Sequence, residues 1–364
     1  MFNGQTGEAW MLAHLARATQ SDRFAQVATD ALASACAVCA EPSAILTYAR
    51  RVGVGLTGLG SLLFALEDAG RALGDTALRE AAANVVTAPL EEVFAEVGFT
   101  ELYWGLPMLA LGLMALPPTP TRDQRLRAIV AALKDAPRVL DPELGLSVWS
   151  PRFGRPQAGL AHGVTGVSLA LVRAGSYLQD AEAVALAESA FALERACYRP
   201  ATRAWADTRD IADAHTYAAW CHGAVGIGLA RLSCLRQLPA HHGLATDLRL
   251  IADTLSTQRV AGPANLCCGW LGQVDFLVEA SSMLDPALAV PAHRWGHSVA
   301  THVLTHGYRS LSLDEGVADG PGLWQGLAGI GYLMLRLHDP AVTSCLLTFE
   351  RTPDRGRQPS AQAQ

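Results

Sequence analysis

The sequence predicts an all-α protein built as a seven-fold α/α toroid, a barrel of inner and outer helices. A Gly-x-x-Gly pair followed by an apolar helical run recurs along the chain, and amphipathic segments lie between its copies. Such self-similarity is the sequence signature of a repeat architecture. Half of the 364 residues are hydrophobic but only 7% are aromatic, a composition that favours closely packed helices over sheets.

The glycine pairs begin the predicted inner helices. Six intact pairs precede apolar runs: Gly4 and Gly7, Gly55 and Gly58, Gly163 and Gly166, Gly223 and Gly226, Gly269 and Gly272, and Gly326 and Gly329. The copy at Gly105 is degenerate, because Met108 replaces its second glycine. The runs that follow are apolar on nearly every side, as expected of helices that are buried all round.

The segments between the copies predict the outer helices. Residues 121–136 and 180–198 alternate charged and apolar residues at helical spacing. We expect seven such helices around seven buried ones. A linear solenoid is the alternative, but it needs polar capping repeats, and the first and last copies look like ordinary ones. We therefore expect one closed barrel over residues 1–350, followed by a polar, disordered tail over residues 351–364.

Composition and charge exclude several classes of protein. The chain has 28 basic and 34 acidic residues and no basic block, which argues against a nucleic-acid partner. The N-terminus shows no secretory signal, and the longest apolar stretch, residues 105–116, is too short to span a bilayer. We expect a cytoplasmic protein without a membrane span. Its eight cysteines are then reduced thiols or metal ligands, not disulfides.

In a closed ring the starts of the inner helices gather at one end of the barrel. There the free N–H groups and the positive ends of the helix dipoles favour bound anions and thiolates. The residues that precede the glycines should therefore face a common cavity. In chain order they are Asn3, Val54, Trp104, His162, His222, Cys268 and Gln325.

Three cysteines fall at these helix starts in adjacent copies. Cys221 lies in Trp-Cys-His-Gly, and Cys267 and Cys268 lie in Leu-Cys-Cys-Gly one copy later. Three soft thiolates suit one Zn²⁺ ion and leave its fourth position open, as in catalytic zinc sites. The alternative is that these are small buried residues at crowded helix starts. Their equivalent places in the repeat favour zinc.

Two histidines occupy the position directly before the glycine. His162 could transfer protons near pH 7 beside a metal, but its spacing fits equally well a core histidine bonded to a backbone carbonyl. His222 adjoins Cys221 and is a candidate proton donor, substrate contact or group that orients a ligand. It is the weaker candidate for a zinc ligand, because adjacent residues at a helix start diverge.

Together these motifs resemble the lanthionine synthetase C-like (LanC) cyclases over nearly the whole chain. The resemblance rests on Ala-His-Gly-x-x-Gly at 161–166, Trp-Cys-His-Gly at 220–223 and Cys-Gly at 268–269. The closing Gly-Leu-Ala-Gly-Ile-Gly-Tyr at 326–332 and Arg-Leu-x-Asp-Pro at 336–340 are similar to the cyclase domain of class II lanthipeptide synthetases (LanM).

The resemblance implies a seven-fold α/α barrel with zinc at one end and a defined reaction. A cysteine thiol of a dehydrated precursor peptide is added to dehydroalanine or dehydrobutyrine, which gives a lanthionine or methyllanthionine thioether ring. Cys221, Cys267 and Cys268 would be the zinc ligands, and His162 the acid and base. No dehydratase precedes the first repeat, so we expect a separate dehydratase, or a split or excised class II synthetase.

The chain departs from the pattern of the family at three places, one of which is Tyr217, where some stand-alone cyclases have an arginine four residues before the first cysteine. Most members have His where this chain has Cys268, and a minority share its Cys-Cys-Gly. A third sulfur ligand makes the site more negative, so we expect a more nucleophilic substrate thiolate and faster, less selective ring closure. Many members have an aspartate four residues before the glycine of the third repeat. Counted back from Gly105, this position is Glu101 here.

Three other functions remain open at this point. The protein could be a non-catalytic peptide-binding scaffold in a modification complex, because its third repeat is degenerate. It could add glutathione to dehydrated residues. Toroids of this shape also include glycosidases, but these need a pair of inward carboxylates, and Glu101 is the single inward candidate.

Overall fold

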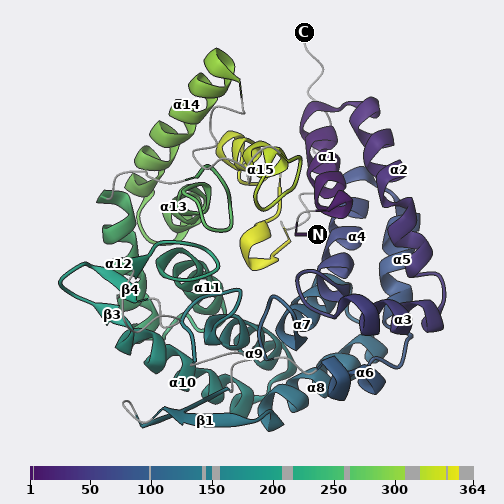
Figure 1. Ribbon diagram of the computed structural model, residues 1–364, viewed down its shortest axis with the longest axis horizontal. Coiled ribbons are helices and arrows are strands. Elements are labelled where there is room, and N and C mark those ends of the chain that lie inside the picture. Colours follow the sequence, from purple (N-terminus) through teal and green to yellow (C-terminus); the bar gives the residue numbers. More distant parts are fainter. Residues whose placement is uncertain are drawn as a thin grey trace.

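The computed structural model describes residues 1–2, 4–97, 100–141, 145–149, 156–206, 216–257, 263–307, 320–341 and 343–351. Within these ranges the helices form a ring of two layers (Figure 1). The inner layer consists of α1 (Gln5–Thr19), α4 (Leu59–Leu73), α7 (Leu106–Ala115), α9 (Val164–Leu178), α11 (Ala224–Gln237), α13 (Leu271–Met283) and α15 (Leu327–His338). Each inner helix packs against the next, and α15 packs against α1. The ring is closed, so the predicted seven-fold α/α toroid is confirmed and the linear solenoid is excluded.

The outer layer surrounds these helices. It consists of α2 (Asp22–Val38), α3 (Pro42–Val52), α5 (Thr76–Val85), α6 (Glu91–Val97), α8 (Pro120–Asp135), α10 (Ala181–Ala196), α12 (His242–Thr257) and α14 (Ala289–His306). The amphipathic segments predicted at 121–136 and 180–198 form α8 and α10. The first two inner helices are each followed by two outer helices instead of one.

Short strands and 3-10 turns complete the described elements. β1 (Arg138–Asp141) pairs antiparallel with β2 (Leu146–Trp149), and β4 (Ala204–Ala206) pairs with both β3 (Tyr198–Arg199) and β5 (Thr216–Tyr217). The 3-10 turns are η1 (Pro286–Leu288) and η3 (Leu346–Thr348). These elements are small, and the protein is all-α as predicted.

Outer and inner helices begin in different ways. The side chains of Asp75, Thr119 and Asp180 accept hydrogen bonds from first-turn N–H groups of α5, α8 and α10. Such caps satisfy donors that have no partner within the helix. Most inner helices instead begin after a glycine without a side-chain cap. Their first N–H groups bond to the preceding loop, as Gly60 N does to Val54 O at 2.9 Å.

The second repeat starts one glycine later than the spacing predicts. α4 begins directly after Gly58, so Gly58 and not Gly55 is the helix-start glycine. Gly55 lies in the loop, where a Cβ would come 2.3 Å from the carbonyl oxygen of Tyr103. The residue before the helix-start glycine is therefore Thr57, and the expectation of Val54 was wrong. Both glycines make close backbone contacts, so the Gly-x-x-Gly spacing could not identify which one starts the helix.

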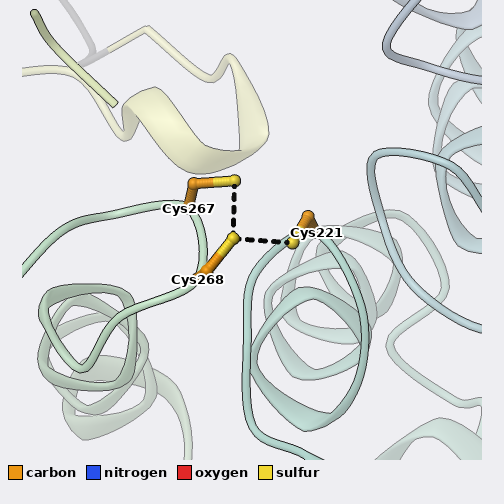
Figure 2. A group of neighbouring side chains, drawn as sticks. All are labelled: Cys221, Cys267 and Cys268. Atoms are coloured by element: carbon orange, nitrogen blue, oxygen red, sulfur yellow. Dashed lines mark hydrogen bonds between the residues drawn. The ribbon is translucent and has the colours of Figure 1, made fainter. Parts of the chain in front are cut away.

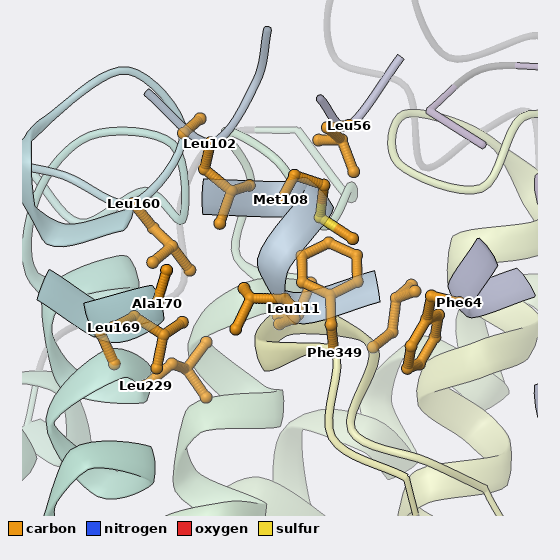
Figure 3. Packing of buried hydrophobic residues seen from close by; sticks show 14 of the residues in the cluster. Leu56, Phe64, Leu102, Met108, Leu111, Leu160, Leu169, Ala170, Leu229 and Phe349 are labelled. Atoms are coloured by element: carbon orange, nitrogen blue, oxygen red, sulfur yellow. The ribbon is translucent and has the colours of Figure 1, made fainter. Parts of the chain in front are cut away.

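After α15 the chain turns into the ring. Residues 343–351, which we call the C-terminal segment, lie inside it (yellow in Figure 1). Every residue of this segment from Thr343 to Phe349 is at most 6% exposed. Phe349 lies beside Met108 and Leu111 of α7 (Figure 3), and its ring centroid is 5.4 Å from that of Phe64. The C-terminal segment therefore completes the core in the middle of the barrel. Residues 352–364 of the predicted tail lie outside the described residues.

No single helix in the described ranges is long and apolar enough to cross a bilayer. The outer helices α2 and α3 meet the criteria of length and composition only as a pair, and the chain bends by 99° between them.

Candidate metal centre

The loops that precede the inner helices hydrogen-bond to one another around one end of the ring. In six of the seven loops, the residue two positions before the helix-start glycine donates its backbone N–H to the carbonyl oxygen of the equivalent residue in the next loop. The pairs are Leu56–Tyr103, Tyr103–Ala161, Ala161–Cys221, Cys221–Cys267, Cys267–Trp324 and Trp324–Phe2, with N···O distances of 2.8 to 3.3 Å. This backbone ladder places Cys221 and Cys267 side by side in equivalent positions.

The three cysteines that the sequence singles out converge at this end of the ring (Figure 2). The Sγ of Cys268 lies 3.4 Å from the Sγ of Cys221 and 3.4 Å from that of Cys267. All three sulfur atoms lie within 4.8 Å of one another. Cys221 and Cys267 are buried, whereas Cys268 is exposed. The cluster is thus closed on the protein side and accessible from solvent.

The sulfur spacing fits a metal ion. Tetrahedral coordination with Zn–S bonds of ≈ 2.3 Å places sulfur ligands about 3.8 Å apart, close to the separations in this cluster. Thiolates are the ligands preferred by zinc and other soft metal ions. Cys221, Cys267 and Cys268 can therefore hold one metal ion and leave one position for a further ligand.

The thiols also perturb one another. Hydrogen bonding with the Cys221 and Cys268 thiols, followed by burial, raises the pKa of Cys267 far above its usual range. Negative charge on all three sulfurs is unfavourable without a cation nearby. A coordinated metal reverses this preference, because a coordinating thiol is deprotonated. The cluster therefore favours protonated thiols or a bound cation.

Asn265 fixes the loop that carries two of the cysteines, a role that the sequence analysis missed. Its Oδ1 accepts hydrogen bonds from the backbone N–H groups of Cys268 and Gly269, both at 2.9 Å. The side chain is 4% exposed. Asparagine commonly makes such bonds to backbone groups a few residues ahead. The Asn-x-x-Cys spacing of Asn265 and Cys268 could have indicated this role from the sequence.

A histidine and a carboxylate lie beside the cysteines. His162 Nδ1 is 3.4 Å from Glu101 Oε2, and its ring stacks on that of His222 with centroids 5.4 Å apart. Glu101 is 8% exposed, whereas the side chain of His162 is 33% exposed. An Nδ1–H that donates to Glu101 leaves Nε2 to exchange protons. The structure thus brings His162, His222 and Glu101 together, and gives His162 a carboxylate partner in place of the alternative carbonyl.

Tyr103 is a further residue of this end that the sequence analysis did not identify. Its ring centroid lies 4.8 Å from that of His162 and 5.3 Å from that of Phe2. Burial, followed by the charges of Cys267 and Glu101, raises the pKa of Tyr103. The phenol therefore stays protonated at neutral pH. Its place two residues before a helix-start glycine, equivalent to Cys221, could have revealed it.

One of the solved structures similar to this chain supports the fold described above. The solved structure "Nisin cyclase" matches with a TM-score of 0.70 and 14% sequence identity, over 96% of this chain and 91% of that chain. An unsaturated glucuronyl hydrolase from Bacillus sp. GL1 matches with a TM-score of 0.49 and 15% identity, over 84% of this chain and 90% of that chain. No curated protein sequence matches significantly. The family model described as "Lanthionine synthetase C-like protein" matches residues 1–348, so the chain belongs to the lanthionine synthetase C-like family.

Proposed function

We propose that this protein is a zinc-dependent lanthipeptide cyclase. It adds cysteine thiols of a dehydrated precursor peptide to dehydroalanine and dehydrobutyrine, and so forms lanthionine and methyllanthionine rings. The observation that carries the proposal is the cluster of three sulfurs beside the His162–Glu101 pair. Membership of the family supports the same reaction.

Cys221, Cys267 and Cys268 would hold the zinc ion. Bound there, zinc would lower the pKa of a substrate thiol that takes the fourth position and keep it as the nucleophilic thiolate. The exposure of Cys268 supports access to the cluster for a peptide. Its thiol, in place of the imidazole found in most relatives, would make the substrate thiolate more nucleophilic.

His162 would move the proton. In the reaction the C–S bond forms at the alkene β-carbon, and the electron pair of the double bond passes to the adjacent carbonyl as an enolate. The proton released by the substrate thiol is taken by His162 Nε2 and returned to the α-carbon. Glu101 orients the ring, because its carboxylate lies at Nδ1. Atoms and charge balance without a further reactant.

We assign the neighbouring residues supporting roles. His222 is stacked on His162 and adjacent to Cys221, which suits a substrate contact or a second proton donor. The proposed partners are the dehydrated precursor peptide and the dehydratase that supplies it. The closing motifs favour the class II type of cyclase. All eight cysteines are free thiols, which fits a reducing compartment such as the cytoplasm.

Thiol protection tests the reaction directly. The zinc-loaded protein is incubated with a peptide that contains dehydroalanine and cysteine, and free thiols are then alkylated before the peptide is weighed. Ring closure leaves the mass unchanged but removes one alkylation site. We expect protection far above the uncatalysed background. Alkylation equal to that background would reject the cyclase and leave the scaffold. A gain of one glutathione mass per site, in a parallel reaction with glutathione, would identify the glutathione-adding enzyme.

A matched pair of variants controls for loss of a cysteine as such. Cys267→Ala removes one sulfur of the cluster, whereas Cys234→Ala removes a fully buried thiol of α11 that is not one of the three. We expect Cys234→Ala to bind zinc as wild type does. Equal zinc content in both variants would show that the cluster is not the metal site.

A further inference from the structure

Trp220, the residue before Cys221, joins two distant parts of the chain. Its backbone N–H donates to the carbonyl oxygen of Cys267 at 3.0 Å. Its side chain is fully buried, and the indole Nε1–H donates to the carbonyl oxygen of Leu347 at 2.9 Å. Leu347 lies in the C-terminal segment inside the ring. The same tryptophan thus bonds to the loop of one candidate metal ligand and to the C-terminal segment, while it directly precedes another ligand.

The C-terminal segment holds the Leu347 carbonyl in a fixed place. Arg173 Nη1 of α9 donates to Thr348 O at 2.7 Å. Ser344 Oγ donates to Asp68 Oδ1 of α4 at 2.7 Å. Leu346 N donates to the Tyr332 hydroxyl of α15 at 3.1 Å. Three inner helices therefore anchor the segment on both sides of Leu347.

A second buried tryptophan provides the contrast. Trp324 packs on Trp220 with ring centroids 4.1 Å apart, and its backbone carbonyl accepts the N–H of Cys267 at 3.2 Å. Within the described part of the chain, however, the buried Nε1–H of Trp324 has no hydrogen-bond partner. The two side chains are alike in size and burial, and they differ in the bond to the C-terminal segment.

We propose that Trp220 is a positioning residue for the metal centre, and that the C-terminal segment is part of that centre through the Leu347 carbonyl. The indole bond fixes the loop that places the Cys221 sulfur opposite those of Cys267 and Cys268. Partners that orient metal ligands typically change metal affinity by 10–100-fold when they are lost. The proposal rests on the proposed zinc site.

Zinc affinity of the full-length protein tests it. Trp220→Phe keeps a buried aromatic ring but removes the donor, and Trp324→Phe makes the same change where the donor has no partner. Affinity is measured by competition with a chromogenic chelator, and the unfolding midpoint of each metal-free variant is measured in parallel. We expect Trp220→Phe to bind zinc at least about tenfold more weakly, and Trp324→Phe to match wild type. The absorption bands of bound Co²⁺ should also shift in Trp220→Phe alone.

A change in α9, at the anchor of the C-terminal segment, tests the same link from its other side. Arg173→Lys weakens the anchor at Thr348 and leaves the indole in place, so it also decides the matter if Trp220→Phe does not fold. We expect it to weaken zinc binding, and we expect its effect not to add to that of Trp220→Phe, because residues in one network are coupled.

The outcomes separate this inference from the proposed function. Zinc bound with equal affinity by wild type, Trp220→Phe and Arg173→Lys would overturn the role of the C-terminal segment and leave the cyclase intact. Absence of stoichiometric zinc in the wild-type protein would overturn both.

Discussion

The two ends of the barrel carry different chemistry on the same inner helices. Where the helices begin, thiols and imidazoles gather around one buried carboxylate, Glu101. Where they end, Arg236 in the last turn of α11 and Arg336 in the last turn of α15 share ion pairs with Glu279, and Arg336 also pairs with Asp275. Helix dipoles give a physical reason, since they favour thiolates at N-terminal ends and guanidinium groups at C-terminal ends.

The difference separates reactivity from stability. At the end where the helices finish, which we call the ion-pair end, Glu279 pairs with two arginines, so its charge is compensated within the protein. At the end where the helices begin, which we call the open end, Cys268 is exposed and His162 is partly exposed. We expect changes at the open end to affect metal binding and activity, and changes at the ion-pair end to affect folding.

The largest expected effect is at the open end. Cys267→Ala removes one of the three sulfurs, so we expect loss of stoichiometric zinc and a fall of ring formation to the uncatalysed rate. Zinc content by mass spectrometry and thiol protection measure the two losses. The unfolding free energy of the metal-free protein should change little; a collapse of the fold would contradict the separation of the two ends.

The corresponding change at the ion-pair end is Arg336→Met. It leaves Asp275 and Glu279 without their shared arginine inside the protein, which costs about 3–5 kcal/mol of unfolding free energy. Chemical denaturation measures the loss. Arg50→Met, which breaks exposed ion pairs with Glu92 and Glu96, should cost about 1 kcal/mol or less. Similar losses in both variants would count against a stabilising role of the ion-pair end.

A smaller effect should follow Cys268→His, which keeps a ligand but replaces a thiolate by an imidazole. We expect zinc to stay bound and ring formation to slow, because the site becomes less negative and the bound thiolate less nucleophilic. Initial rates of thiol protection at saturating peptide measure the change. A variant as fast as wild type, or faster, would show that the third sulfur does not set the reactivity.

The smallest effect concerns acid stability. Burial by itself would raise the pKa of Asp68, but the His14 ion pair and hydrogen bonds from His14, Ser344 and Trp10 outweigh it and lower the pKa. A lowered pKa contributes stability above the unfolded-state value of about 3.9, and that contribution is lost as the pH falls through the folded-state value. Asp68→Asn should therefore be less stable than wild type at pH 7, with a gap that narrows under acid. Denaturation curves across this pH range measure the gap; a gap independent of pH would refute the assignment.

Much of the site could be predicted, because the repeat encodes it locally. Apolar runs after glycine gave the inner helices, and the position of each cysteine within its repeat gave the convergence of Cys221, Cys267 and Cys268. The partner of His162 needed more than spacing. Glu101 lies 61 residues earlier, and only the packing of adjacent loops brings its carboxylate to the ring nitrogen. The catalytic roles of His162 and Glu101, and the binding of zinc to the cysteines, remain predictions.

The sequence by itself determined the number of repeats, the closed ring and the end at which the reactive residues gather. These follow from periodicity and residue type, which are properties of short stretches of chain. Only the tertiary structure decided that Gly58 starts α4, and that the C-terminal segment fills the barrel. The Trp220–Leu347 bond joins residues 127 positions apart. Such contacts depend on how the closed ring leaves space at its centre, and no local pattern carries that information.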